Sequence, residues 1–265
     1  MAHAAVPGAV WSIREGALQL SLPQGSRVGG GGVLEHSVQH ADHTPLPARS
    51  PLRRAVGGLA RCVVDLTFGL GTDAMLLARS GLTVLACEIS PPVLALAVDG
   101  LRRAAADPDA SIRAAAQRIC VLACDAVELL RQPSQAALPA AVHRGSDAPA
   151  YVPAANASTV VYIDPMFPAK RRADALPPKA AQVLQAVLRP NDQQAAEQAA
   201  TLLAAARAAG FPRILLKRPD DAPPLAGLAP VGSVAGRAVR YDLYTGVSGP
   251  DRPSPAAPCE KPDRG

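Results

Sequence analysis

The feature that most constrains this chain is an alternation, from residue 62 to residue 216, of short apolar runs with helix-like segments. The apolar runs cover residues 62–66, 83–87, 119–123, 159–163 and 213–216. The helix-like segments cover residues 73–80, 91–106, 126–131 and 193–209. Continuous apolar strands separated by helices are typical of a parallel sheet with both faces covered. The pattern therefore predicts an α/β fold with a Rossmann-like, mostly parallel sheet and helices on both faces.

The ends of the chain read less clearly than its middle. Residues 9–22 alternate loosely, as a hairpin would, and are followed by the run Gly29–Gly32, which we interpret as a flexible loop. Residues 240–244 alternate like one more strand, whereas 247–265 are rich in proline and polar residues. We expect a weakly defined N-terminal extension at 1–58, a main domain at 59–246 and a disordered tail at 247–265. The segment 132–158, rich in Pro, Ala and Ser, is also expected to be disordered.

The cysteine pattern and the hydropathy of the chain bear on the cellular compartment in which we expect the protein. The chain has 5 cysteines without a C-x-x-C motif, and most of them lie in or just beyond apolar runs, which suggests a reducing environment. No run is long enough to cross a membrane, and the N-terminus lacks the pattern of a secretory signal, so we expect a cytoplasmic protein. His36, His40 and His43 have a spacing that a metal site could use. Because no Cys pattern supports them, we interpret them as part of a solvated loop and expect no metal.

A glycine turn follows the first apolar run. Gly69 and Gly71 would let the backbone approach a ligand closely, and the next helix would offer unpaired N–H groups there. Together with Ala74, these glycines also match the fingerprint of a nicotinamide-dinucleotide site. Asp65, at the end of the strand, would repel a diphosphate but would attract the amino group of a methionine moiety. The turn therefore favours S-adenosylmethionine, with a purely structural strand–helix turn as the alternative.

Acidic residues also follow the next two strands. Glu88 ends the second run, where a carboxylate can accept hydrogen bonds from both ribose hydroxyls of a nucleoside cofactor. This feature fits S-adenosylmethionine and NAD equally. Cys124 and Asp125 follow the third run. Asp125 could accept a hydrogen bond from an adenine amino group or could cap the helix at 126–131, and both interpretations stay open.

The fourth strand ends in the most informative motif, Asp164-Pro165-Met166-Phe167-Pro168. The prolines stiffen the turn and remove backbone donors, which leaves carbonyl oxygens and the Asp164 carboxylate as acceptors. Acceptors beside an aromatic ring suit the exocyclic amine of a flat base, on which Phe167 would stack. The alternative is a structural turn with Phe167 in the core.

Cations gather near the same predicted edge. Lys217 and Arg218 end the fifth strand, and Lys170, Arg171 and Arg172 follow the Asp-Pro-Met-Phe turn. These side chains could bind RNA phosphate or orient the substrate, and a solvated charge cluster is the alternative. The net charge of +5 permits a nucleic-acid partner without requiring one.

Four motifs in this order, VVDLTFGLGTDA, YIDPMFP, LLKRPDDAPPLAG and RYDLYTG, resemble the bacterial ribosomal RNA small-subunit methyltransferase J family. The resemblance covers roughly residues 52–246 and makes 59–246 a methyltransferase domain. It implies a class I methyltransferase fold and methyl transfer from S-adenosylmethionine to the N2 amine of a guanine in 16S ribosomal RNA. The implied partner is 16S ribosomal RNA or the small ribosomal subunit.

The resemblance also implies positions for the cofactor contacts, with several departures from the family. The implied contacts are Thr72, Asp73, Glu88, Ile89, Cys124, Asp125 and Asp164. Thr72 and Ile89 stand where the family usually carries arginine, and Cys124 with Asp125 replaces two small hydroxyl residues. The family's basic, glycine-rich segment ahead of the domain is matched only by Gly29–Gly32 and by residues 52–58.

These departures motivate a second hypothesis, a catalytically impaired relative that binds RNA or cofactor. A third, less favoured hypothesis is an NAD-dependent oxidoreductase, which rests on the glycine fingerprint alone. In the main hypothesis, Asp164 and the Pro165 carbonyl orient the amine for in-line displacement at the sulfonium methyl.

Overall fold

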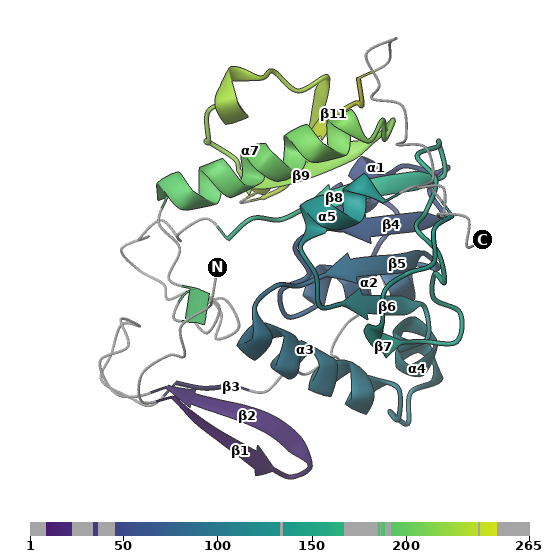
Figure 1. Ribbon diagram of the computed structural model, residues 1–265, viewed down its shortest axis with the longest axis vertical. Coiled ribbons are helices and arrows are strands. Elements are labelled where there is room, and N and C mark those ends of the chain that lie inside the picture. Colours follow the sequence, from purple (N-terminus) through teal and green to yellow (C-terminus); the bar gives the residue numbers. More distant parts are fainter. Residues whose placement is uncertain are drawn as a thin grey trace, which may run out of the picture.

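The computed structural model describes residues 9–22, 34–36, 46–132, 135–166, 185, 187–188, 192–237 and 239–247. Its centre is an eight-stranded sheet with the strand order β10-β11-β9-β8-β4-β5-β6-β7 (Figure 1). The strands are β4 (Cys62–Asp65), β5 (Thr83–Cys87), β6 (Ile119–Leu122), β7 (Ala141–Arg144), β8 (Thr159–Ile163), β9 (Ile214–Pro219), β10 (Gly232–Ala235) and β11 (Val239–Tyr244).

The five central strands are parallel, which confirms the predicted sheet. β4 pairs in parallel with β5 and β8, β5 with β6, and β8 with β9. The outer strands β7, β10 and β11 pair antiparallel with their neighbours. β11 is the strand predicted at 240–244, whereas nothing in the sequence analysis indicated β7 or β10.

The expectation of disorder at 132–158 was wrong. This segment contains β7 and an isolated bridge between Ala137 and Tyr151. Its backbone is also closed by the hydrogen bonds Gln135 N to Val152 O and Val152 N to Ala136 O, each 2.9 Å long. The segment is held by these backbone hydrogen bonds and by apolar side chains such as the buried Val152, so its Pro, Ala and Ser content was a poor guide to its order.

Helices cover both faces of the sheet (Figure 1). They are α1 (Pro51–Val56), α2 (Thr72–Arg79), α3 (Pro91–Ala104), α4 (Ala110–Ala116), α5 (Ala126–Arg131) and α7 (Asp192–Ala208), with a 3-10 helix η1 at Leu225–Gly227. One buried cluster takes side chains from α1, α2, α3 and α4, and a second takes them from α5 and α7. α1 and α4 were not predicted. The predicted helix at 126–131 is confirmed to the residue.

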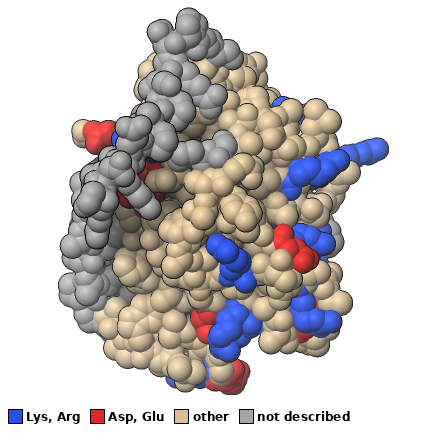
Figure 2. Space-filling view, turned by 45° about the vertical axis from the view of Figure 1, so that its right-hand side comes forward, with Lys and Arg blue, Asp and Glu red and all other residues tan. Residues whose placement is uncertain are grey.

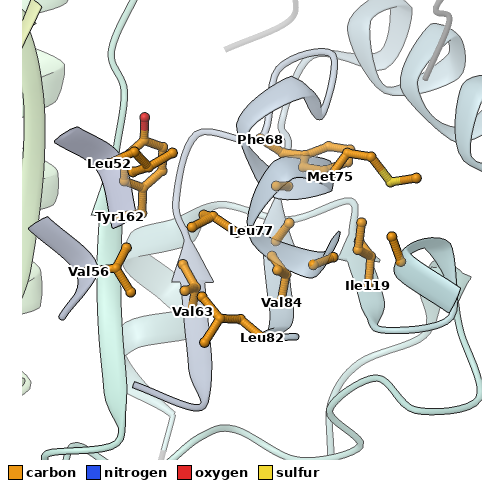
Figure 3. Packing of buried hydrophobic residues seen from close by; sticks show 14 of the residues in the cluster. Leu52, Val56, Val63, Phe68, Met75, Leu77, Leu82, Val84, Ile119 and Tyr162 are labelled. Carbon is orange, nitrogen blue, oxygen red and sulfur yellow. The ribbon is translucent and has the colours of Figure 1, made fainter. Parts of the chain in front are cut away.

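Strand alternation explains how one sheet serves both clusters. Val63 of β4 and Val84 of β5 point into the first cluster, whereas the next residues, Val64 and Leu85, point into the second. Figure 3 shows Val63, Val84 and Ile119 of three neighbouring strands on the side of the sheet where α2 lies. Because both faces are buried, these strands read as continuous apolar runs in the sequence.

The predicted hairpin is confirmed as β1 (Val10–Arg14) and β2 (Ala17–Leu22), joined by a short third strand, β3 (Leu34–His36). This small sheet packs on α3, where Leu18 N donates to Asp99 Oδ2 at 3.0 Å and Arg102 Nη2 donates to Gly16 O at 3.1 Å. The run Gly29–Gly32 and the residues His40 and His43 lie outside the described residues. In the described ranges, no helix is long and apolar enough to span a bilayer.

Candidate active site at the carboxyl edge of the sheet

The central strands bring the predicted acidic residues to one edge of the sheet. Asp65 ends β4, Glu88 follows β5, Asp164 follows β8, and Lys217 lies toward the end of β9. Since β9, β8, β4 and β5 are consecutive and parallel, their carboxyl ends lie side by side. Ligands of open α/β sheets bind outside this edge. The edge is therefore the candidate active site.

Glu88 is held in place by backbone donors. Its Oε2 accepts from Gly69 N at 2.9 Å and its Oε1 from Ser90 N at 2.7 Å. Burial raises the pKa of the Glu88 carboxyl above its ordinary value, and these backbone hydrogen bonds partly offset that effect. Carboxylate oxygens can accept more than one hydrogen bond each. This arrangement suits the two hydroxyls of a ribose.

The glycine turn is tightly packed beneath this site. Gly71 has a φ of 77° and begins α2 as its N-cap residue. A Cβ at this position would lie 2.6 Å from Cζ of Phe68, whose own N donates to Cys87 O at 3.0 Å. Both the left-handed backbone and the nearby ring therefore require glycine. Thr72, the first residue of α2, is exposed.

Asp65 is almost entirely enclosed. It is 2% exposed, and its Oδ1 accepts from Thr67 N at 3.0 Å. Burial raises the pKa of Asp65 to about 8, and the nearby charges of Asp73, Asp164 and Glu88 contribute to the rise. In this structure Asp65 therefore holds its proton near neutral pH. A cation placed beside it would favour the ionised form.

One lysine joins two carboxylates on the other half of the edge. Lys217 Nζ lies 2.8 Å from Asp73 Oδ2 and 2.9 Å from Asp164 Oδ2. The Tyr162 hydroxyl also donates to Asp73 Oδ2, at 2.5 Å. Burial alone would lower the pKa of Lys217, but the charges of Asp164 and Asp73 outweigh it and raise that pKa. Lys217 is therefore a fixed cation that sets the position of both carboxylates.

The Asp-Pro turn after β8 leaves the Asp164 carboxylate partly exposed. The backbone N of Asp164 donates to Thr67 Oγ1 at 2.6 Å, which ties the turn to the end of β4. The Asp164 side chain is 35% exposed despite its ion pair, so it reaches solvent at the edge. Pro165 is buried and Met166 half-buried. Phe167 lies outside the described residues.

The residues after β6 have a structural role. Asp125 is exposed and caps α5, since its Oδ1 accepts from Val127 N at 2.7 Å. Of the two interpretations left open, the helix cap is present in the structure. Cys124 lies beside Cys87 with 3.5 Å between the sulfur atoms. Ile89, beyond Glu88, is 46% exposed.

The expected cationic rim is divided. Neighbouring strand residues point to opposite faces, and Arg218 is 6% exposed near the charge of Asp242, whereas Lys217 faces Asp164. The two side chains therefore do not point the same way, and phosphate binding by both together, one of the roles considered from the sequence, does not follow from their adjacency. Lys170, Arg171 and Arg172 lie outside the described residues.

Charges on one side of the molecule are interspersed. In the view of Figure 2, Lys and Arg side chains stand in separate groups, with Asp or Glu side chains beside several of them. A nucleic-acid footprint is typically a continuous basic patch or stripe. The described part of this face therefore does not by itself identify an RNA-binding surface.

Sequence reasoning missed two contributors to the site. Tyr162 was counted only as part of an apolar strand, and Thr67 only as part of the glycine turn. The signal for Tyr162 was its position two residues before Asp164, on the same face of β8. Thr67 had a weaker signal, a hydroxyl two residues after the buried Asp65.

Comparison with known proteins assigns the chain to a family. Residues 33–246 match a family described as "Putative SAM-dependent methyltransferase". The proteins called ribosomal RNA small subunit methyltransferase J of Alcanivorax borkumensis and Stutzerimonas stutzeri are 39% and 33% identical to the chain, over 69% and 88% of its length. A SAM-dependent methyltransferase of Neisseria gonorrhoeae shares the fold, with a TM-score of 0.59, 24% identity and coverage of 95% of this chain and 88% of that one.

The matches differ in how much of each relative they include. The match to the Alcanivorax protein covers 60% of that protein. A Citrobacter koseri relative of the same name is 37% identical over 70% of this chain, and the match covers 63% of that relative. The chain therefore spans less than two thirds of the length of these two relatives. The match covers 81% of the Stutzerimonas protein. On the family match and on these identities, the chain belongs to the ribosomal RNA small subunit methyltransferase J family of SAM-dependent methyltransferases.

Proposed function

We propose that this chain uses S-adenosylmethionine to methylate the N2 amine of a guanine in 16S ribosomal RNA. The observation that carries the proposal is the edge of the sheet, where the carboxyl groups of Asp65, Asp73, Glu88 and Asp164 lie near one another and Lys217 binds two of them, Asp73 and Asp164. Family membership supports the reaction type, and the names of the relatives support the substrate. We place the reaction in the cytoplasm.

The residues of this edge fit S-adenosylmethionine. The cofactor carries a positive sulfonium and a positive ammonium, and the edge carries more carboxylates than cations. Asp65 would face the ammonium, Glu88 would accept the ribose hydroxyls, and Cys124 with Asp125 would lie beside the adenine. Backbone of the 69–73 turn would line the methionine portion, so the exposed Thr72 and Ile89 do not need the side-chain contacts of an arginine. When bound, the cofactor supplies the methyl group.

A dinucleotide fits the same edge less well. The diphosphate of NAD would meet the carboxylates of Asp73 and Asp164, and the cation beside them, Lys217, is already bound by both. The oxidoreductase hypothesis is therefore disfavoured by electrostatics as well as by family.

The catalytic half of the edge would hold the guanine amine. Asp164 and the carbonyl of Pro165 would accept its N–H groups, and Phe167 would stack on the base. Lys217 would keep the Asp164 carboxylate in one orientation, so that the nitrogen lone pair points toward the reacting carbon. The amine proton would leave to Asp164 or to solvent as the new bond forms. For phosphate binding we propose Lys170, Arg171 and Arg172, because Lys217 is committed to the two carboxylates.

The experiment has two parts. Calorimetric titration with S-adenosylhomocysteine, with NAD as the control ligand, tests the cofactor, and we expect binding of the first alone. Methyl transfer to 16S ribosomal RNA, supplied free and in small subunits, tests the reaction. Binding without transfer to either substrate would contradict the proposal and favour the impaired relative.

Asp164→Ala gives the sharpest variant test. We expect loss of methyl transfer with the fold retained, because Lys217 keeps Asp73 as a partner. The matched control is Asp147→Ala, an exposed aspartate after β7, at the opposite edge of the sheet. Near-normal transfer by Asp164→Ala would contradict the assigned role.

A further inference from the structure

Two cysteines meet beside the proposed adenine position. Cys87, the last residue of β5, directly precedes Glu88, and Cys124 lies just beyond β6. The parallel register pairs Cys87 with Leu122, so Cys124 stands two residues past that pairing, in the turn before α5. A hydrogen bond joins the sulfur atoms at 3.5 Å. No step of the proposed methyl transfer uses these thiols.

We propose that Cys87 and Cys124 form a reversible oxidation site, which a hydroperoxide converts to a disulfide and a thiol reductant restores. The inference that this bond weakens cofactor binding rests on the proposed function. The existence of the oxidation site does not.

The surroundings assign a role to each sulfur. Cys124 is half-buried and reaches solvent, whereas Cys87 is 1% exposed behind it. The hydrogen bond between the two thiols lowers the pKa of Cys124 below its ordinary value, and the same bond together with burial raises the pKa of Cys87. Because the thiolate is the reactive form, Cys124 attacks the oxidant and Cys87 resolves the product.

The chemistry balances with the hydroperoxide as the oxidant. The Cys124 thiolate attacks one oxygen of the O–O bond, which breaks, and forms a sulfenic acid while the other oxygen leaves as water or an alcohol. The Cys87 sulfur then attacks the sulfenic sulfur, forms the S–S bond and releases water. Two thiols are oxidised and one peroxide is reduced. Thiol–disulfide exchange reverses the bond.

Closing the bond moves the turn after β6. The sulfur atoms must approach from 3.5 Å to the disulfide length of about 2 Å. Cys87 lies in a strand paired on both sides, and its carbonyl accepts from Phe68 N, so it cannot move freely. Cys124 lies in a turn, so it moves toward β5 and takes Asp125, the cap of α5, with it. These are the residues proposed to lie beside the adenine.

The test treats the reduced full chain with hydrogen peroxide and maps its disulfides by mass spectrometry of unreduced peptides. We expect a Cys87–Cys124 linkage that a thiol reductant removes. Cys62→Ala serves as the control, because Cys62 begins β4 at the end away from the site edge. This variant should form the same Cys87–Cys124 linkage. In Cys87→Ser, peroxide should leave Cys124 as a sulfenic acid that dimedone traps. No linkage, or a linkage of either cysteine to another one, would overturn the proposal.

Calorimetry with S-adenosylhomocysteine on the same samples tests the consequence. We expect at least a tenfold loss of affinity on oxidation and its recovery on reduction. Unchanged affinity after complete linkage would overturn the effect on the cofactor site. A reduced chain that binds no S-adenosylhomocysteine would contradict the proposed function instead, and the peptide map would still decide whether the oxidation site exists.

Discussion

The two halves of the site edge are stabilised differently. On the β4 and β5 side, the carboxyl groups of Asp65 and Glu88 accept hydrogen bonds from the backbone N–H groups of Thr67, Gly69 and Ser90. On the β8 and β9 side, Asp164 and Asp73 depend on side chains, above all on Lys217. Backbone donors persist when side chains are substituted. We therefore expect the first half to tolerate departures from the family such as Thr72 and Ile89, and the second half to depend on single residues.

The largest expected effect is the pH dependence of stability that Asp65, in the first half of the edge, causes. The folded-state pKa of Asp65 is about 8, above its ordinary value of 3.8, so the folded chain keeps a proton that the unfolded chain releases. The contribution of Asp65 to stability is therefore lost as pH rises through this range, by about 4 kcal/mol between pH 5 and pH 8. Asp65→Asn should remove this loss. We expect the free energy of unfolding of Asp65→Asn, minus that of the unmodified chain, to increase with pH. Denaturant titration at pH 5 and pH 8 measures this difference.

Val63→Ala is the matched control, since Val63 lies in the same strand, is fully buried and does not titrate. Its destabilisation should be equal at both pH values. A constant difference between Asp65→Asn and the unmodified chain would show that Asp65 ionises as easily when folded as when unfolded.

The next effect tests the dependence of the second half on one cation. Lys217→Met leaves two carboxylates facing each other without their shared partner, so Asp164 loses its orientation. We expect methyl transfer to fall about 100-fold, equivalent to about 3 kcal/mol in the barrier. Tyr162→Phe removes only the hydroxyl that donates to Asp73 and should cost a few-fold. Equal losses in single-turnover rates of the two variants would contradict the assigned importance of Lys217.

A backbone substitution probes the rigidity of the first half. Gly71→Ala places a Cβ 2.6 Å from Phe68 Cζ at a φ of 77°. We expect a loss of about 2 to 3 kcal/mol in thermal unfolding, since strain and steric overlap act together. Gly81→Ala shares the positive φ, at 89°, but meets nothing within 4 Å, so strain alone should cost about 1 kcal/mol. Similar losses for both would mean that the ring moves aside easily.

The smallest effect concerns the residue that joins the two halves. Thr67 donates its N–H to Asp65, and its hydroxyl accepts from Asp164 N. Thr67→Val keeps the shape but leaves the Asp164 N–H without this acceptor, at a cost of about 1 kcal/mol. Thr67→Ser keeps the acceptor and should lie closer to the unmodified chain in stability. The reverse order would indicate that the methyl group, rather than the hydroxyl, matters here.

The central parallel strands, and the carboxyl groups at their ends, were predicted well from the sequence because they depend on strand burial and chain order. Runs such as 83–87 are continuous because β5 is covered on both faces, and parallel pairing then brings Asp65, Glu88 and Asp164 to one edge. The antiparallel strand β7 and the helix α4 were missed because backbone hydrogen bonds and short alanine-rich packing leave little periodic signal.

Within the site, side-chain direction was the harder problem. Lys217 and Arg218 are adjacent in the sequence and were treated as a pair, yet strand alternation separates them. Likewise, Asp125 carried two interpretations of equal weight because a helix cap and a ligand contact require the same residue type at the same place. Contacts between distant residues, such as Lys217 with Asp73, cannot be derived from spacing alone.

The place of β11 in the sheet has a consequence for the order of synthesis. β9, which carries Lys217, pairs on one side with β8 and on the other with β11, near the C-terminal end of the described chain. Until residues 239–244 leave the ribosome, β9 is an open edge strand with unpaired backbone groups. The nascent chain therefore completes the β8 and β9 side of the site edge last. Products truncated before β11 should retain an exposed, association-prone edge on β9, the strand that carries Lys217.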